Sequence, residues 1–591
     1  MAGTESDHID QVGRKQPLGR REILKGLALA GIAGAGKVLA EPRLEETTAS
    51  RPVGTCIPRV EQWGLQEIVL HSDHEYENEF KAVQLQCTFT TTGKSVTADG
   101  FFDDNSRWLI RFMPDTQGHW TFRTKSNDSL LSGVTGEFEV TAPKQGNRGP
   151  VSVTNQFHFS LADGTPFYPL GTTTYLLFHQ DREIQLRTFA TLSRTAFNKV
   201  RIFVMPFSSL LPGEAPFART ADGKFDYDRY NPGFFGRYES GLRDLQVLGI
   251  EADLILFHPY DIKGEFSRLS REQDEGYIRY AVARLSAYRN VWWTLTNEFD
   301  LYPQFGIHKD WRALGELLEM SDPYRHLRGI HNSCVGFYDN SESWITHVIL
   351  QDITLQRLTP VPRNNSAMSL DARKVGKPVV VDEYGYEGDI AMTWGSLAPR
   401  EAVEMHWSIV MGGAYGSHGE TYFGTPPGDF VGEAPERLAF LKGIMTQTDF
   451  QKLVPLPEVM SGQDPAVTVL GTPGLCYIFH FDQPKEVASW NLGFFGPATP
   501  SHPLPIKSGA VNPNTFSKPA PQFTIADGVY RVEVIDTWQM KVHHAGFTSG
   551  PSQQFRSPVE PGIVRLTRAE AAPAEEKVLP MSELLRRLSP F

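Results

Sequence analysis

Two apolar, strand-forming runs of this chain each end in a glutamate. The first, residues 291–300, reads VWWTLTNEFD and reaches Glu298. The second, residues 377–385, reads KPVVVDEYG and reaches Glu383. Uninterrupted apolar runs that end abruptly in polar residues are typical of strands buried on both faces of a sheet. The pattern therefore favours a parallel sheet that presents carboxylates at one edge.

Between about residues 155 and 450, strand-like and helix-like segments alternate, which predicts parallel βα units. Eight strands are expected: Phe167–Tyr175, Lys199–Met205, Ala252–His258, Val291–Asn297, Leu327–Asn332, His347–Gln351, Pro378–Glu383 and Gly412–His418. Eight strands with crossover helices over this length predict an α/β fold, a (β/α)8 TIM barrel. No glycine-rich phosphate loop follows the first strand, so a dinucleotide-binding fold is not expected.

Short alternating strands on both sides of this region predict flanking β-sandwiches. Before the barrel, over residues 55–145, the expected strands are Glu67–His71, Ala82–Thr90, Trp108–Pro114, His119–Lys125 and Gly136–Thr141, with turns at Gly100 and Asp103–Asn105. After it, over residues 451–591, they are Ala466–Leu470, Cys476–Phe481, Glu486–Asn491, Tyr530–Asp536 and Gly562–Thr567. A proline-rich insert at residues 497–521 is expected to be an exposed loop.

The composition excludes some classes of function but does not indicate a particular one. The formal net charge of −12 over 591 residues argues against a nucleic-acid partner. The four cysteines have no metal-binding spacing. Cys87 shares a strand face with apolar residues and is expected to be buried, although a disulfide with Cys56 stays open.

The N-terminal 50 residues are expected to be a targeting and disordered segment. Arg20 and Arg21 precede a Gly/Ala-rich apolar stretch that is too short to span a membrane, and Ala40 is a plausible cleavage site. The arrangement resembles a twin-arginine export signal, which implies a periplasmic or extracellular protein with no membrane span in its mature form.

In a (β/α)8 barrel the active site lies at the C-terminal ends of the strands, so Glu298 and Glu383 are the first candidates. Two facing carboxylates are what glycosidic hydrolysis with retention requires. The alternative is that both are helix-start residues that favour the helix dipole. Asp300, Asp382 and Glu387 are competing carboxylates, and strand alternation predicts that Asp382 points toward the helix layer if Glu383 faces the barrel mouth.

Asn-Glu after strand four and Glu after strand seven together resemble the clan of retaining (β/α)8 glycoside hydrolases. The resemblance implies that Glu298 is the acid/base, Glu383 the nucleophile, and Asn297 a contact for the sugar 2-hydroxyl. Arg201 on strand two is similar to the clan's arginine and is expected to pair with Glu383, with a barrel-wall salt bridge as the alternative. Further expected substrate contacts are His258, His331, Tyr384 and His418, each histidine being as compatible with a structural role.

The barrel more specifically resembles an apiosidase-like family, through Pro166–Gly171, Phe197–Pro206 and His418–Tyr422. Residues 100–103 and 111–123 resemble the immunoglobulin-like domain that precedes many such barrels, and residues 532–540 resemble their C-terminal sandwich. There are two departures. The family's usual Asp-Thr-Ala-Trp reads Thr172–Tyr175 here, and the tryptophan that many clan members carry after strand eight is not evident.

The sequence thus predicts an exported, retaining glycoside hydrolase that acts on a plant or microbial polysaccharide or oligosaccharide, with no metal or organic cofactor. A metal-dependent barrel hydrolase is a rival, but strand one lacks the expected His-x-His. A non-catalytic carbohydrate-binding barrel is the second rival.

Overall fold

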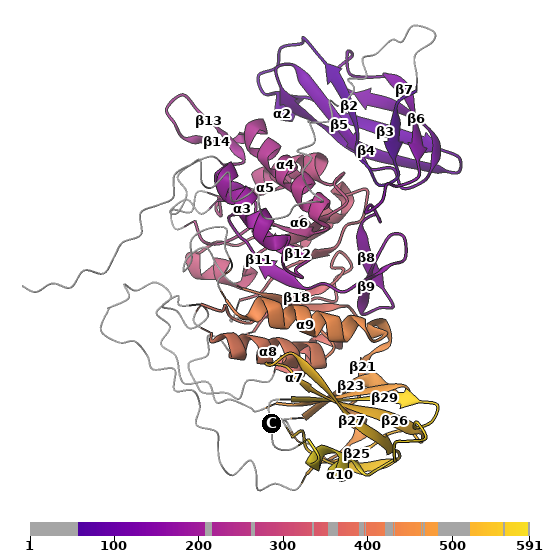
Figure 1. The fold of residues 1–591 in the computed structure, drawn as a ribbon. Helices are drawn as coiled ribbons and strands as arrows, with labels where there is room; N and C mark the ends of the chain where they lie inside the picture. The colour runs from indigo at the N-terminus through magenta and orange to yellow at the C-terminus, as the bar shows by residue number, and fades with distance from the viewer. Residues whose placement is uncertain are drawn as a thin grey trace, which may run out of the picture. The chain divides into compact units, whose positions relative to one another are not determined.

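The computed structural model describes residues 57–206, 215–261, 266–333, 336–352, 365–388, 395, 397–419, 430, 432–462, 464, 467–482, 520–558 and 562–588. Its central sheet has eight parallel strands in the order β17-β16-β15-β12-β11-β20-β19-β18 (Figure 1). Their bounds are β11 Gly171–Thr173, β12 Lys199–Phe203, β15 Glu251–Phe257, β16 Val291–Thr296, β17 Arg328–Gly329, β18 Val348–Gln351, β19 Val379–Glu383 and β20 Tyr415–His418. A parallel bridge between His331 and Ile349 joins the two edges, so the barrel is nearly closed.

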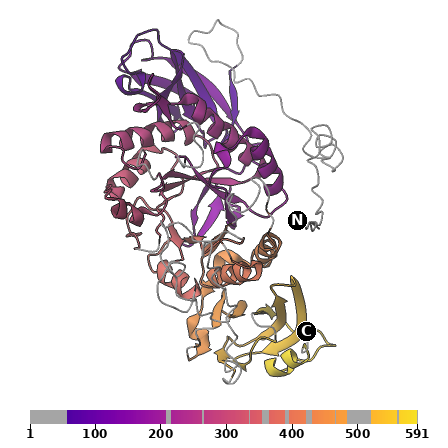
Figure 2. The ribbon, with the colours of Figure 1, turned by 90° about the vertical axis from the view of Figure 1, so that its left-hand side faces the viewer.

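Helices surround these strands (Figure 2). The longer ones are α3 Arg182–Leu192, α4 Pro232–Leu248, α5 Arg271–Leu285, α6 Trp311–Ser321, α7 Asn365–Arg373, α8 Pro399–Met411 and α9 Ala434–Thr446. In α6 the buried side chains include Trp311, Leu314, Leu317 and Leu318, which lie on one face at helical spacing. Burial of that apolar face against the sheet positions the strand ends that carry the candidate site.

The N-terminal β domain contains two strands that were not expected, β1 at its start and β4 in its middle. Its sheet order is β1-β7-β6-β3-β4-β5-β2. The bounds are β1 Arg59–Glu61, β2 Gln66–His71, β3 Leu85–Thr91, β4 Lys94–Asp104, β5 Arg107–Phe112, β6 Gly118–Ser126 and β7 Thr135–Thr141, with α2 at Glu79–Ala82. The expected turn at Gly100 is wrong, because Gly100 lies inside β4. A Cβ there would lie 2.6 Å from a Leu85 methyl, so close packing rather than a turn requires glycine.

A small three-stranded sheet before the barrel was not expected from the sequence. It consists of β8 Val151–Thr154, β9 His158–Leu161 and β10 Pro166–Phe167. Phe159 of β9 is fully buried, with its ring centroid 5.2 Å from that of Trp292 near the start of β16. Phe167 pairs with this small sheet, so the first barrel strand begins only at Gly171.

The C-terminal region is also rich in β-strands. One sheet has the order β21-β23-β24-β29-β26-β27, and a second has the order β22-β25-β28. The bounds are β21 Val454–Pro455, β22 Met460–Ser461, β23 Val467–Thr472, β24 Cys476–Phe481, β25 Gln522–Thr524, β26 Val529–Asp536, β27 Lys541–Ser549, β28 Ser552–Gln554 and β29 Gly562–Ala569, followed by α10 Met581–Arg586. The expected strand at residues 486–491 and the proline-rich insert lie outside the described residues.

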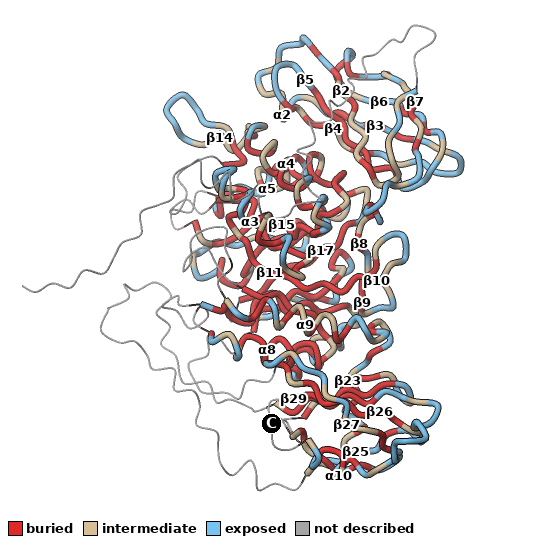
Figure 3. Tube along the Cα trace, in the orientation of Figure 1, coloured by how far each residue is buried: buried red, intermediate tan, exposed pale blue. Residues whose placement is uncertain are grey.

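Buried residues concentrate in the barrel strands and in the inner faces of the two β regions (Figure 3). Cys87 is a buried free thiol, as expected, and burial raises its pKa to about 12. Cys56 and the predicted export signal lie outside the described residues. Over the part of the chain that is described, no helix combines the length and apolarity needed to cross a membrane.

Candidate active site

Glu298 and Glu383 lie at the ends of two parallel strands of the same barrel, and both are at the same end of that barrel. Every residue of β16 is buried, and Glu298 comes two residues after its end. Glu383 is the last residue of β19. The exposed fractions of the two residues are 4% and 8%. Strand ends thus hold both carboxylates at the mouth, where barrel active sites lie.

Glu298 has a backbone conformation that a non-glycine residue rarely adopts. Its φ is 43°, in the left-handed region, immediately before the 3-10 helix η2 (Phe299–Phe305). Glu298 is therefore a helix-start residue by position, as the alternative interpretation expected, but its side chain makes no capping hydrogen bond to that helix. Strained backbone of this kind is concentrated at functional sites.

A continuous chain of hydrogen bonds joins the two glutamates. Nη1 of Arg201 donates to Oε1 of Glu383 at 2.9 Å, and Nη2 donates to Oδ1 of Asn297 at 2.7 Å. Nδ2 of Asn297 donates to the Tyr260 hydroxyl at 2.7 Å. That hydroxyl in turn donates to Oε2 of Glu298 at 2.5 Å. The expected Arg201–Glu383 ion pair is present, and the network fixes both carboxylates relative to each other.

The surroundings of Glu298 favour a protonated carboxyl. Burial, reinforced by the negative charge of Glu383 and to a smaller extent that of Asp300, raises the pKa of Glu298 to about 8. Hydrogen bonds from Tyr260 and Gln351 oppose the rise in this pKa. Oε2 of Glu298 accepts the hydrogen bond from the Tyr260 hydroxyl. The proton of a neutral Glu298 carboxyl is therefore expected on the other oxygen, Oε1.

Glu383 lies among a guanidinium and two phenols. The Tyr175 hydroxyl donates to its Oε1 and lies 2.7 Å from the hydroxyl of Tyr386. Nη1 of Arg201 donates to the same Tyr175 oxygen at 3.0 Å. Nε2 of His331 lies 3.9 Å from Oε1 of Glu383. Arg201 and Tyr175 therefore stabilise the negative charge of this carboxylate and hold its orientation.

Asp382 does not point toward the helix layer, so that expectation is wrong. Its carboxylate accepts two hydrogen bonds from Nζ of Lys199, at 2.9 and 3.1 Å, and one from Oγ of Ser417. The pairing of β18 with β19 shifts register at Asp382, because Leu350 pairs with Val381 and the next residue, Gln351, pairs with Glu383. A β-bulge breaks the strict alternation of side chains, so Asp382 and Glu383 both reach groups carried by β12.

Three other predicted site residues make contacts that favour structural roles. Nε2 of His258 is 3.0 Å from the Met205 carbonyl, and its Nδ1 accepts from the backbone of Tyr260 at 3.1 Å. Nε2 of His418 is 3.1 Å from Oε2 of Glu387. The Tyr384 hydroxyl is 3.1 Å from Nδ1 of His406 on α8, so it is directed toward the helix layer.

The sequence prediction missed one phenol at the site, Tyr260, and assigned no hydrogen-bonding role at the site to Tyr175, Tyr386 or Gln351. Tyr260 and Tyr386 follow strands that were assigned, but each lies two or three residues beyond the strand end, in a loop. Tyr175 was noticed only as a departure from the family's usual tryptophan. A search of the first few residues after every strand would have found these side chains, since barrel sites are built from such loops.

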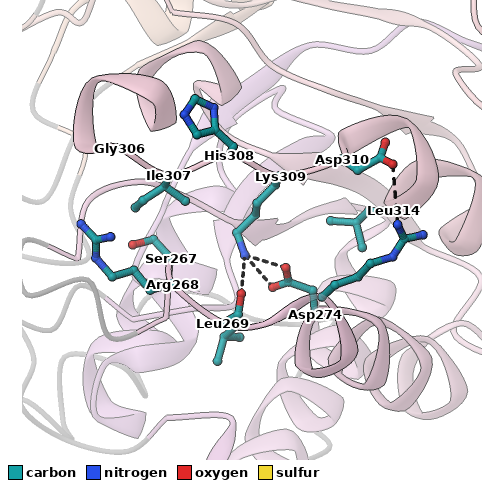
Figure 4. A pocket seen from close by; sticks show the side chains of 11 residues that line it. Ser267, Arg268, Leu269, Asp274, Gly306, Ile307, His308, Lys309, Asp310 and Leu314 are labelled. Carbon is teal, nitrogen blue, oxygen red and sulfur yellow. Dashed lines mark hydrogen bonds and ion pairs between the residues drawn. The ribbon is translucent and has the colours of Figure 1, made fainter.

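A separate cavity of about 390 Å³ lies beside the loop that leaves η2 (Figure 4). Its lining runs from Ser267 through Asp274 and from Gly306 to Leu314. Nζ of Lys309 lies 2.6 Å from Oδ2 of Asp274 within it. Neither Glu298 nor Glu383 lines this cavity. Within the described residues, no group of three or more His, Cys, Asp and Glu side chains is arranged to hold a metal ion.

Comparison with known proteins agrees with this geometry. Residues 153–424 match the family described as "Apiosidase-like, catalytic domain", and residues 59–127 match a domain of unknown function, DUF5060. No curated protein matches the chain. A crystal structure of a "putative glycoside hydrolase" from Bacteroides vulgatus ATCC 8482 is 28% identical, with a TM-score of 0.70, and the match covers 87% of this chain and 100% of that one.

A glycoside hydrolase family 5 structure from the same organism shares the fold at 13% identity, with a TM-score of 0.52 and coverage of 75% of this chain and 98% of that one. The strand-end glutamates and the nearly closed barrel are consistent with these matches. Residues 153–424 match the model of an apiosidase-like catalytic domain, and the fold is similar to that of a putative glycoside hydrolase.

Proposed function

We propose that this protein is a retaining glycoside hydrolase with a (β/α)8 catalytic domain. The observation that carries the proposal is the unequal environment of two linked carboxyls. Glu298 has a pKa raised to about 8 and holds a proton at neutral pH. Glu383 is paired with the guanidinium of Arg201 at 2.9 Å. A protonated carboxyl and a charge-stabilised carboxylate are the acid and the nucleophile of double displacement.

In the first step, Oε1 of Glu298 gives its proton to the glycosidic oxygen while a carboxylate oxygen of Glu383 attacks the anomeric carbon. The bond to the leaving group breaks, and a glycosyl ester forms on Glu383. The negative charge on Glu383, the anionic partner of Arg201, then decreases. Nη2 of Arg201 continues to donate to Asn297. Asn297 is held by hydrogen bonds with Arg201 and Tyr260, and in this proposal it contacts the sugar 2-hydroxyl.

In the second step, the ionised Glu298 takes a proton from water, and the resulting hydroxide attacks the anomeric carbon. The ester bond to Glu383 breaks and its carboxylate returns to Arg201. Two inversions give net retention, for which carboxyl groups roughly 5–5.5 Å apart are required. The phenol of Tyr260 keeps Glu298 in one orientation through both of its roles.

His331 supports a polar contact with the sugar. It is fully buried, and within the described residues neither of its ring nitrogens has a hydrogen-bond partner. Burial, together with the charge of Arg201, lowers its pKa well below the usual value, so the ring is neutral with one donor and one acceptor. An unsatisfied buried imidazole 3.9 Å from Glu383 suits a sugar hydroxyl.

We propose a plant or microbial polysaccharide or oligosaccharide as the substrate, and export by the twin-arginine route. An aryl apioside belongs in the first substrate panel because the matched family is described as apiosidase-like. No metal requirement is expected, so activity should survive a chelator. Loss of activity on chelation that returns with a divalent metal would favour the metal-dependent alternative.

Glu383→Gly and Glu298→Ala test the proposal with an activated aryl glycoside. Both variants should lose most turnover, whereas Glu251→Gln should keep it. Glu251 is a matched control, because burial raises its pKa to about 8 as well, but it begins β15 at the other end of the barrel. Full turnover by either site variant would contradict the assignment. Sugar binding by the wild-type chain without hydrolysis would favour the non-catalytic alternative.

A further inference from the structure

A buried ion cluster lies beneath the two glutamates. It joins Arg201 to Lys199, Asp253 and Asp382, three residues that play no part in the steps above, and the exposed fractions of all four are 0 to 1%. Nζ of Lys199 lies 2.7 Å from Oδ2 of Asp253 and 2.9 Å from Oδ1 of Asp382. Ions this deep are costly unless they are paired, and Lys199 and Arg201 each have an oppositely charged partner within the cluster.

Asp382 is the member of the cluster that connects to the site. Its Oδ2 lies 3.7 Å from Nε of Arg201, the guanidinium nitrogen that has no hydrogen-bond partner within the described residues. Nη1 and Nη2 of that guanidinium are directed to Glu383 and Asn297. Asp382 thus attracts the Nε side of Arg201, while the forked end faces the site.

Asp253 provides the contrast. It shares Lys199 with Asp382, but its other oxygen accepts from Oγ of Thr294 at 2.6 Å. The second partner of Asp382, in comparison, is Ser417 on β20. The two aspartates are thus equally buried and bind the same lysine, yet Asp382 is the one with a close approach to Arg201.

We propose that Asp382, anchored by Lys199 and Ser417, is a positioning residue that fixes the guanidinium of Arg201 and thereby the orientation of Glu383 and Asn297. The inference rests on the proposed function of Glu383. The guanidinium of Arg201 donates to two acceptors at once, so its rotation must be restrained. The ion pair between Nε of Arg201 and Asp382 supplies that restraint. The bulge that turns Asp382 inward is what makes the contact geometrically accessible.

Other charged or titratable groups also lie around Arg201 and Glu383. They are Lys199, Asp253, Asp382, Tyr175, Tyr386, His331, Tyr260 and Glu298. Asp382→Asn removes one negative charge from this set while keeping the size of the side chain, so the test needs a control variant with the same change of charge.

The test compares Asp382→Asn with Asp253→Asn in the full chain, using an aryl glycoside that the wild type cleaves. Asp382→Asn should lower kcat/KM about ten- to a hundredfold, mainly through kcat. Asp253→Asn removes the same charge from the same lysine and should cost less than about threefold. Equal losses in the two variants, or wild-type kinetics for Asp382→Asn, would overturn the proposal.

A double-mutant cycle and a milder variant guard against misfolding. In an Arg201→Lys background, Asp382→Asn should cost much less than it does alone, and full additivity would refute the connection through Arg201. If Asp382→Asn does not fold, Ser417→Ala loosens Asp382 without removing a charge, and it should lower kcat a few-fold at unchanged KM. Wild-type kcat in Ser417→Ala would then overturn the proposal. If Glu383→Gly itself retains full turnover, the proposed function fails, which is a separate result.

Discussion

Glu298 and Glu383 are both buried carboxyls at the ends of parallel strands, but their neighbours differ. Glu298 lies near two negative charges and accepts a phenol hydrogen bond, and its pKa rises to about 8. Glu383 accepts from a guanidinium and from a second phenol. The same residue type at equivalent positions thus acquires opposite chemical tendencies from its surroundings, which is how one fold supplies both an acid and a nucleophile.

The comparison is tested most strongly by replacing each carboxyl with an amide, which can neither supply the acidic proton nor attack the sugar. Glu298→Gln should lower kcat/KM about a thousandfold for glycosides with poor leaving groups and far less for activated aryl glycosides, since only the former need protonation. Glu383→Gln should lower kcat/KM for both substrate classes alike. Steady-state kinetics on paired substrates measures the difference, and equal leaving-group dependence in the two variants would contradict the division of roles.

Tyr260 and Tyr175 should differ in their effects on the pH dependence of kcat/KM. The basic limb of wild-type kcat/KM should fall near pH 8, where Glu298 loses its proton. Tyr260→Phe removes a hydrogen bond that lowers the pKa of Glu298, so this limb should move to higher pH, with an activity loss of about tenfold. Tyr175→Phe should lower kcat while leaving the basic limb in place. A basic limb that moves only in Tyr175→Phe would reverse the assignment.

Asp300→Asn should shift the same limb the other way. The charge of Asp300 helps to raise the pKa of Glu298, so its removal should move the basic limb to lower pH by about half a unit. Asp300 also accepts from the backbone of Ser333 at 2.6 Å and of Gly336 at 2.8 Å, so Asn is preferred to Ala. A shift to higher pH would show that Glu298 is not the group that titrates.

Glu251→Gln gives the smallest expected effect, and it acts on stability. Burial raises the pKa of Glu251 to about 8, so the folded state keeps a proton that the unfolded state releases above about pH 4.5. The contribution of Glu251 to the stability of the folded state is therefore fully present below pH 4.5 and is lost as pH rises through 8. The variant can still accept from Nε1 of Trp292 and should be more stable than wild type at pH 8 but not at pH 4.5. Chemical denaturation at the two pH values measures this, and equal differences would contradict it.

The parts of this structure that the sequence predicted are those set by local pattern. Apolar runs ending in polar residues located β16 and β19. Asp382 was misplaced because a bulge depends on pairing with a neighbouring strand, which alternation along one strand does not contain. Gly100 was misplaced for a similar reason, since its role is to let Leu85 pack closely.

The site could be predicted only in outline. The two glutamates and Arg201 stood out because charged residues rarely lie in buried strands. Tyr175 and Tyr260 did not stand out, because aromatic residues in loops after strands are usually packing residues, and their hydroxyl partners lie far away along the chain. Tyr175 and Glu383 are 208 residues apart in sequence, so their hydrogen bond depends on barrel closure.

The stereochemistry of azide rescue tests the central claim most directly. Glu383→Gly and Glu298→Ala, each supplied with an activated aryl glycoside and azide, should form glycosyl azides whose anomeric configuration is read by NMR. Azide replacing the nucleophile in Glu383→Gly should give inverted product, whereas azide attacking the glycosyl ester in Glu298→Ala should give retained product. Products of the same configuration from both variants would contradict the assignment of Glu298 as acid/base and Glu383 as nucleophile.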